Sequence, residues 1–194
     1  MALVSPYLTE KFIVYPGDVI TSNLAFAVLL IDEFTQQGPA GHIVVKLKGR
    51  GAKAIKNPSG YFLFTDLPSG TYTASVESDY FFPVEETVDM SVLDAKNPVV
   101  QIVLKPNPGY PFPAGATLLR GVITNAAPVE GADVSVTGKT ITTVTDKRGE
   151  FILYFRGTKI EAITIVIQKG GDTKSAGATI EEGKSVSTGV IHFP

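Results

Sequence analysis

Short runs of strand-forming residues, separated at close intervals by glycine and proline, constrain the fold of this chain more than any other feature. The 194 residues include 19 glycines and 13 prolines. Both residue types interrupt helices, and the runs between them are rich in Val, Ile, Thr, Phe and Tyr, which favour extended backbone. The runs that read as strands are residues 42–49, 60–67, 71–78, 99–106, 131–138, 140–146, 149–155 and 162–169.

Several of these runs alternate between apolar and polar residues. In the run 131–138, Ala132, Val134 and Val136 alternate with polar residues. A period of two buries one face of a strand and leaves the other in water, as in antiparallel sandwiches. Turn signals recur every 8–12 residues or so, which is the spacing of a β-sandwich or barrel. The sequence therefore predicts an all-β chain of antiparallel Greek-key sandwiches.

A proline-rich segment divides the chain into two parts. Four prolines fall within residues 105–115, so this segment is unsuited to a central strand and favours a stiff, extended path. We predict an N-terminal arm or extra strand at 1–23, a first sandwich at 24–105, a connector at 106–115 and a second sandwich at 116–194. The connector is either a plain linker or a segment whose Tyr110 and Phe112 are buried between the sandwiches and fix their angle.

The two predicted sandwiches resemble each other in sequence. Each contains Asn or Asp, then Gly three residues later, then Phe two residues after the Gly. Upstream, residues 38–47 and 127–136 each place a proline and a glycine before a strand-like run. Two copies of one unit explain this repetition. The matched residues are Asn57, Gly60 and Phe62 in the first copy and Asp146, Gly149 and Phe151 in the second.

The charged stretch "TDKRGEF" at 145–151 raises the question of a catalytic site. A short carboxylate or carboxamide before a tight turn accepts hydrogen bonds from backbone N–H groups two or three residues later. Glycine at the end of the turn adopts positive φ without a Cβ clash. We therefore predict hairpin turns at Asn57–Gly60 and Asp146–Gly149, with Phe62 and Phe151 as core anchors. Lys147 and Arg148 then lie at an exposed tip.

These residues carry a family resemblance. Residues 120–136 and 143–153 resemble the carboxypeptidase regulatory-like domain, a transthyretin-like (prealbumin-like) β-sandwich. The second strand of the family pattern matches at Pro128, Gly131, Ala132 and Val134, and its Thr-Asp-x-x-Gly-x-Phe motif matches at Thr145, Asp146, Gly149 and Phe151. A Leu-Pro-x-Gly-x-Tyr element of the family occurs in the first copy at Leu67, Pro68, Gly70 and Tyr72.

The chain also departs from the family pattern. Gly121 of the opening strand is in place, but Ile123 stands where the family has Val. The first copy has Asn57 in place of Asp, and its opening strand lacks the glycine. The resemblance implies two tandem transthyretin-like or Ig-like sandwiches. It implies little about function, because such sandwiches are mostly accessory modules.

Composition argues against several functions. The net charge of −2 gives no electrostatic basis for binding nucleic acid, and the absence of cysteine removes disulfides and thiolate chemistry. The only histidines, His42 and His192, form no metal-ligand spacing, and no nucleophile elbow or phosphate loop is present. We expect no cofactor, no metal and no enzymatic activity. The acidic pairs Asp32–Glu33, Glu85–Glu86 and Glu181–Glu182 are interpreted as solvated loop or edge charges.

The sequence shows no targeting or membrane signal. The first 18 residues lack a basic start followed by an apolar core, and the apolar run 24–31 is too short to span a bilayer. We expect a cytoplasmic chain, or part of a soluble particle, without membrane insertion.

Two aromatic clusters, at 80–86 and 109–113, leave a second function open. Flat aromatic rings stack on sugars, although Trp, the strongest platform, is absent. The alternative is core or interdomain packing of Tyr80, Phe81, Phe82, Tyr110 and Phe112.

We expect a non-catalytic structural or adaptor protein that contacts other proteins, such as an accessory component of a phage-tail-like particle. The alternative is a carbohydrate- or cell-surface-binding module. The arm at 1–23 could pair with the sheet edge of a partner chain. The partner, the ligand, the oligomeric state and the host compartment are left open by the sequence.

Overall fold

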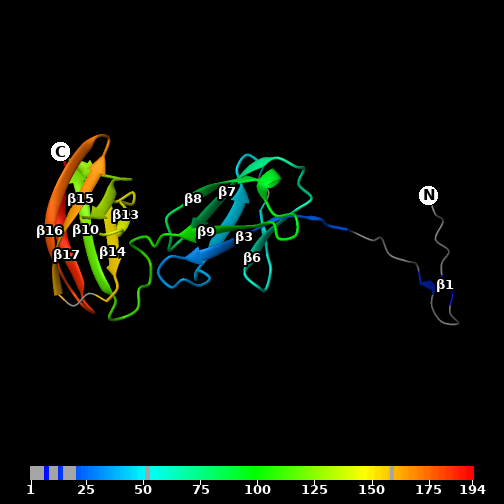
Figure 1. Cartoon of the computed structure of the whole chain (residues 1–194), viewed down its shortest axis with the longest axis horizontal. Coiled ribbons are helices and arrows are strands. Elements are labelled where there is room, and N and C mark those ends of the chain that lie inside the picture. Colours follow the sequence, from blue (N-terminus) through cyan, green and yellow to red (C-terminus); the bar gives the residue numbers. More distant parts are fainter. Residues whose placement is uncertain (1–6, 9–12, 15–20, 51–52, 158–159) are drawn as a thin grey trace.

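The computed structural model describes residues 7–8, 13–14, 21–50, 53–157 and 160–194. It confirms the prediction of an all-β chain with two sandwiches, which lie one after the other along the long axis (Figure 1). Near the N-terminus, β1 (Tyr7–Leu8) pairs with β2 (Ile13–Val14). Most of the remaining predicted arm lies outside the described residues.

The first sandwich packs a sheet of order β5-β6-β3-β9 on a sheet of order β4-β7-β8. The core between them contains Phe26, Val28 and Leu30 of the first sheet and Val45 and Val76 of the second, each at most 3% exposed. The elements are β3 (Leu24–Asp32), β4 (Ile43–Leu47), β5 (Ile55–Lys56), β6 (Tyr61–Thr65), β7 (Thr71–Ser78), β8 (Val84–Asp89), the 3-10 helix η1 (Met90–Val92) and β9 (Val99–Leu104).

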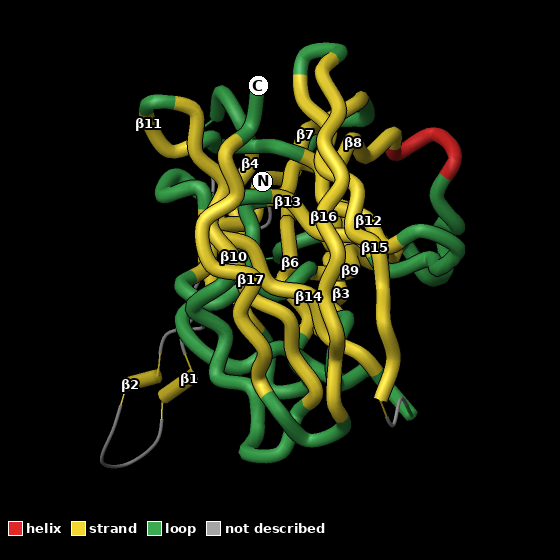
Figure 2. The backbone as a smooth tube through the Cα atoms, turned by 90° about the vertical axis from the view of Figure 1, so that its left-hand side faces the viewer, coloured by secondary structure: helices red, strands yellow, loops and turns green. Residues whose placement is uncertain are grey.

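The second sandwich is built in the same way. One sheet holds β11, β10, β14 and β17, and the other has the order β13-β12-β15-β16. Figure 2 shows β10 beside β17 in one layer and β15 beside β16 in the other. The strands are β10 (Thr117–Asn125), β11 (Ala127–Pro128), β12 (Asp133–Val136), β13 (Thr142–Val144), β14 (Glu150–Phe155), β15 (Ile160–Lys169), β16 (Asp172–Glu181) and β17 (Ser185–His192).

Strand pairing relates the two sandwiches strand by strand. The first strand of each, β3 or β10, pairs antiparallel with β6 or β14 and parallel with the last strand, β9 or β17. The second sheets, β4-β7-β8 and β12-β15-β16, also correspond. The two copies therefore share the topology of their long strands and differ in the placement of the short strands β5, β11 and β13. The purely antiparallel prediction needs correction, because each sandwich contains one parallel pair between its first and last strands.

The longer strands β8, β16 and β17 lie where no strand was predicted, and so do the two-residue strands β5 and β11. The segment 168–177, which the glycines suggest is a loop, is mostly strand. Only Gly170 and Gly171, with φ of 60° and 98°, form the turn between β15 and β16. Positive φ at both positions is what a two-residue hairpin turn requires. Most side chains of β16 are exposed, so the strand lacks the apolar alternation that reveals a half-buried strand.

The two Asx turns have matching geometry. Asn57 Oδ1 accepts a hydrogen bond from Tyr61 N at 2.9 Å, and Asp146 Oδ1 accepts from Glu150 N at 2.9 Å. Gly60 and Gly149 adopt φ of 87° and 72°. The following aromatics, Phe62 and Phe151, are 5% and 1% exposed in the two cores.

Only one of these two turns is a hairpin, although hairpins were predicted at both. β5 pairs with β6 across Asn57–Gly60, so that turn is a hairpin. Across Asp146–Gly149, however, β13 pairs with β12 and β14 pairs with β10. The second turn therefore carries the chain from one sheet to the other, because each of its strands finds its partner elsewhere.

Candidate functional site: the junction between the sandwiches

The connector is packed against the first sandwich. Tyr110 is 8% exposed and belongs to the first core, and Phe112 is half-buried against the same core. Pro106 bridges to Phe81, and Asn107 N donates to Tyr80 O at 2.9 Å. Residues 106–112 therefore extend the first sandwich toward the second.

Asp32, the last residue of β3, organises the loop that faces the connector. Its side chain is buried, and the residue is 1% exposed. Oδ1 accepts from Phe34 N at 2.7 Å, while Oδ2 accepts from the Tyr110 hydroxyl at 2.5 Å. One carboxylate thus ties the loop after β3 to the connector. The interpretation of the Asp32–Glu33 pair as solvated charges is wrong for Asp32, because the connector covers it.

Four aromatic rings meet between the sandwiches, and we call them the junction cluster. Phe34 comes from the loop after β3, Tyr110 and Phe112 from the connector, and Tyr154 from β14. Phe34 makes edge contacts with all three others, at centroid distances of 5.9, 4.9 and 5.2 Å in that order. Edge-to-face packing of this kind adds roughly 0.5–1.5 kcal/mol per pair beyond the burial of area. The cluster draws rings from both sandwiches and from the connector.

Polar contacts surround the junction cluster. The Tyr154 hydroxyl donates to Glu33 O at 3.3 Å, and Arg156 donates to Phe34 O. The Arg156 guanidinium also lies 5.8 Å from the centroid of the Phe34 ring, a cation–π distance. Lys105 Nζ donates to Thr142 Oγ1 at 3.0 Å. The second sandwich therefore satisfies backbone carbonyls that the loop after β3 presents.

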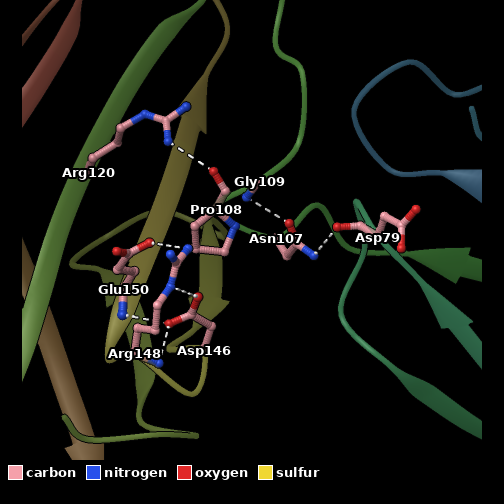
Figure 3. Close-up of polar contacts among 8 residues, drawn as sticks. All are labelled: Asp79, Asn107, Pro108, Gly109, Arg120, Asp146, Arg148 and Glu150. Atoms are coloured by element: carbon pink, nitrogen blue, oxygen red, sulfur yellow. Dashed lines mark hydrogen bonds and ion pairs between the residues drawn. The ribbon is translucent and has the colours of Figure 1, made fainter. Parts of the chain in front are cut away.

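A second set of polar contacts holds residues 107–109 of the connector (Figure 3). Asn107 Nδ2 donates to Asp79 O at 3.0 Å, and Asn107 Oδ1 accepts from Gly109 N at 2.7 Å. Arg120 of β10 donates to Pro108 O at 3.1 Å. These bonds attach one short stretch of connector to both sandwiches.

The junction alters the acidity of three groups. Burial raises the pKa of Tyr110, and the hydrogen bond to the Asp32 carboxylate raises it further. Burial, together with the nearby Glu33 charge, raises the pKa of Tyr154 to about 12. Loss of hydration also raises the pKa of Glu33, although Lys105 opposes this shift. Both tyrosines are therefore neutral hydroxyl donors at physiological pH.

Two clefts flank the connector. The cleft of about 350 Å³ is lined by Glu33, Lys105, Thr142, Tyr154 and Arg156, among others. The cleft of about 500 Å³ lies by the Asp146 turn and includes Phe81, Phe82, Asn107 and Arg148. The described residues hold no group of three or more His, Cys, Asp or Glu that could bind a metal.

The predicted aromatic residues occupy different places. Tyr110 and Phe112 lie in the junction cluster, which corresponds to the second interpretation of the connector. Tyr80 is half-buried. Its ring packs closely on Gly41, because a Cβ at that glycine would lie 2.6 Å from Tyr80 Cδ2. Phe82 is half-buried and lines the larger cleft. The four residues thus do not form one shared platform.

The other candidate residues stay at the surface. His42 and His192 are exposed. Glu85 pairs with Lys48 at 2.8 Å, and Glu181 pairs with Lys184 at 2.6 Å.

Sequence reasoning missed Phe34, Tyr154, Arg156 and the burial of Asp32. One signal was present in β14: Phe151, Leu153 and Phe155 point inward, so Ile152 and Tyr154 lie on the outer face. Two adjacent large apolar or aromatic residues on an outer face indicate that something covers it. No local pattern identifies Phe34, since its partners come from distant segments.

No protein-family model matches the chain, and no curated protein matches it. Among solved structures, the Bacillus anthracis TIE protein is similar at 12% identity and a TM-score of 0.33, over 88% of this chain and 33% of that one. This chain thus spans about a third of the length of that protein. The shaft pilin SpaA of Lactobacillus rhamnosus GG is similar at 12% identity and a TM-score of 0.30, over 89% of this chain and 97% of that one.

These identities and TM-scores are too low to assign a family or a function. Among the described residues, no helix is long and apolar enough to cross a membrane.

Proposed function

We propose that this chain is a non-catalytic structural or adaptor protein that holds two sandwiches at a fixed angle and presents their surfaces to other proteins. The junction cluster is the observation that carries this proposal. A plain linker would need no buried carboxylate at Asp32 and no rings shared between the sandwiches. A fixed spacing between two binding surfaces is useful in a larger assembly, for example as an accessory component of a phage-tail-like particle.

The resemblance to the carboxypeptidase regulatory-like domain supports an accessory role and belongs to the same proposal. The shared topology of the two copies and the matching Asx turns support tandem copies of such a module. A fold does not by itself imply a function, so this support is an analogy with the family.

The test is affinity capture of the tagged full-length protein from its native cells, followed by gradient sedimentation and mass spectrometry. We expect recovery in a large particle with the same neighbouring proteins in replicate captures. The double variant Phe34→Ala, Tyr154→Ala should keep both sandwiches folded but lose recovery in the particle. Val92→Ala, at a side chain that is 78% exposed and outside the junction cluster, is the matched control. Recovery as a small free species would contradict the proposal.

The carbohydrate-binding alternative has less support. Tyr110 and Phe112 contact each other at a centroid distance of 4.6 Å, and both contact Phe34, so both rings take part in packing at the junction. A glycan array with the intact protein tests the alternative. Binding that is lost in Phe82→Ala, with the fold preserved, would favour it over the structural proposal.

A further inference from the structure

The strand β9 lies at one edge of its sheet, because the order β5-β6-β3-β9 ends there. Ala27 N donates to Pro98 O at 2.8 Å, and Glu33 N donates to Leu104 O at 3.0 Å. The even-numbered residues of β9 therefore turn their backbone groups toward β3, and residues 99, 101 and 103 turn theirs away from the sheet. Within the described parts of the chain, no strand pairs with β9 on that side.

The unpaired part of this edge is short and has defined ends. Phe82 N donates to Lys105 O at 3.0 Å, so the loop before β8 closes the edge beyond residue 103. At the other end, Val99 N donates to Asn97 O at 2.8 Å, and this tight turn marks the start of the strand. An edge with free N–H and C=O groups is a template for pairing with another strand.

The other edge strands of five or more residues carry features that oppose such pairing. A charged side chain is present in each of β4, β8, β14 and β16, namely Lys46, Glu85, Glu150 and Lys174 among others. Charges on an edge strand discourage association with a second strand.

The strand β17, which corresponds to β9 in the second sandwich, is protected in a different way. Its pairing with β10 shifts register between Arg120 and Val122, and Gly189 at this point has a φ of 69°. A bulge of this kind bends an edge strand and interrupts its pairing pattern. Residues 97–104 contain no charged side chain, and β9 pairs with β3 without a register shift. The edge of β9 therefore lacks both kinds of protection.

The outward side chains of β9 form a pattern that is the same in both chain directions. Gln101 is exposed and stands between Val99, which is half-buried, and Val103, which is 53% exposed. When a second copy pairs antiparallel with Gln101 opposite the partner's Gln101, each Val99 lies opposite the partner's Val103. Valine then meets valine, amide meets amide, and no like charges face each other. The strand is thus complementary to a second copy of itself.

We propose that two copies of this chain associate through β9, antiparallel and about a two-fold axis at Gln101, so that their four-stranded sheets form one continuous sheet. Gln101 N donates to O of the partner's Gln101, and Val103 N donates to O of the partner's Val99. The two valines of each copy also lose exposed apolar surface, which drives association. An interface of this kind is isologous, so it closes at the dimer.

This inference goes beyond the proposed function and does not rest on it. It names a second copy of the chain as a partner and leaves the junction cluster unchanged.

Sedimentation equilibrium of the full-length protein tests the proposal. We expect a monomer–dimer equilibrium for the parent protein. Gln101→Pro removes an N–H that points away from β3, so the pairing of β3 with β9 keeps its hydrogen bonds, and proline is tolerated at such edge positions. Because the variant loses the two central hydrogen bonds of the dimer, its association should be weaker by about tenfold or more. Circular dichroism checks that the variant is folded.

Val190→Pro is the matched control. Val190 pairs with Val122 of β10 as Gln101 pairs with Leu29 of β3, and it is 58% exposed. Phe193 N donates to Thr124 O, so Val190 also turns its backbone groups away from the sheet. This variant should associate as the parent protein does. Unchanged association of Gln101→Pro would overturn the proposal. A parent protein that stays monomeric at every concentration would leave the edge to a different partner, and would also overturn it.

A disulfide provides a second readout, which reports the register and does not require a proline. The chain has no cysteine, so Gln101→Cys introduces a single thiol. The Cα atoms of a hydrogen-bonded antiparallel pair lie about 5.5 Å apart, which a disulfide can span. Under mild oxidation, Gln101→Cys should form a covalent dimer, whereas Val190→Cys should stay monomeric. A Gln101→Cys protein that crosslinks no faster than Val190→Cys would contradict pairing through β9.

Discussion

At the scale of single residues, Gly149 shows how one position can combine two constraints. Its φ of 72° favours glycine, and a Cβ there would lie 2.3 Å from Ile123 O. Gly149 O also accepts from Ile123 N at 2.8 Å. The turn after Asp146 therefore touches β10 through its backbone.

Gly138 gives a matched comparison for Gly149. Its φ is 73°, but a Cβ there would meet nothing within 4 Å. Gly138→Ala should cost roughly 1 kcal/mol from backbone strain alone, whereas Gly149→Ala should cost roughly 3 kcal/mol or more because strain and overlap add. Chemical denaturation of both variants measures the difference. Equal costs would show that β10 does not approach Gly149 closely.

Two buried threonines make a second matched pair. Thr145 Oγ1 donates to Val129 O at 2.5 Å and accepts from Ala132 N at 2.8 Å, whereas Thr143 Oγ1 has no hydrogen-bond partner among the residues that the structure describes. Thr145→Val should destabilise the protein by roughly 1–3 kcal/mol, because it leaves buried backbone groups unpaired. Thr143→Val should be neutral or stabilising in the same unfolding experiment. A larger loss of stability in Thr143→Val than in Thr145→Val would mean that the two hydroxyls have other hydrogen-bond partners than these.

How far the sequence predicts the structure depends on whether the cause is local. The Asx turns were predictable, because Asn57 and Asp146 bond to backbone groups within four residues of themselves. The burial of Asp32 was not, since its partner Tyr110 is 78 residues away. The junction cluster as a whole escaped prediction for the same reason.

At the scale of strands, alternation predicts those elements that bury one face. It identified β12, β14 and β15, whose inward residues fill the second core. It could not find β16, whose side chains are mostly exposed, or place the Asp146 turn between sheets. Which strand pairs with which is decided by distant segments.

The first strands of the two sandwiches differ at one equivalent position. Val28 pairs with Phe62 in the first sandwich, and Gly121 pairs with Phe151 in the second. A Cβ on Gly121 would lie 2.2 Å from Thr188 Oγ1 and 2.6 Å from Phe151 Cε1. The β17 strand and the Phe151 ring therefore occupy the space that a side chain needs.

This difference predicts that Gly121→Val destabilises the protein by roughly 2 kcal/mol or more, because overpacking displaces Phe151 or Thr188. The conservative change Val28→Ala should cost roughly 1–3 kcal/mol through the cavity it leaves. Thermal unfolding monitored by circular dichroism measures both. A Gly121→Val protein as stable as the parent would contradict the packing of β17 on β10.

At the scale of the whole molecule, our proposal requires the junction to hold the two sandwiches together. The folded state raises the pKa of Tyr154 to about 12 from the ordinary value of 10.0, so it favours the neutral hydroxyl. The stabilisation from this group is fully present below pH 10 and is lost as the pH rises through about 12. The raised pKa of Tyr110 acts in the same direction.

We therefore expect the junction to loosen in alkaline solution before the sandwiches unfold. A fluorescence-transfer pair with one dye on each sandwich should report a wider distance distribution between pH 10 and 12, while circular dichroism is unchanged. The Tyr110→Phe, Tyr154→Phe variant cannot ionise at these positions and should lose this transition. A distance distribution that does not change with pH would contradict the role of the two hydroxyls.

The central claim, that the junction fixes the angle between the sandwiches, is tested most directly by a distance between them. The chain contains no cysteine, so spin labels can be placed at will. Thr87→Cys on β8 and Ser175→Cys on β16 put one label on each sandwich, at exposed strand positions. Double electron–electron resonance should give one narrow distance distribution for this pair, and a broad one after Phe34→Ala and Tyr154→Ala are added. A broad distribution in the parent protein would contradict the account.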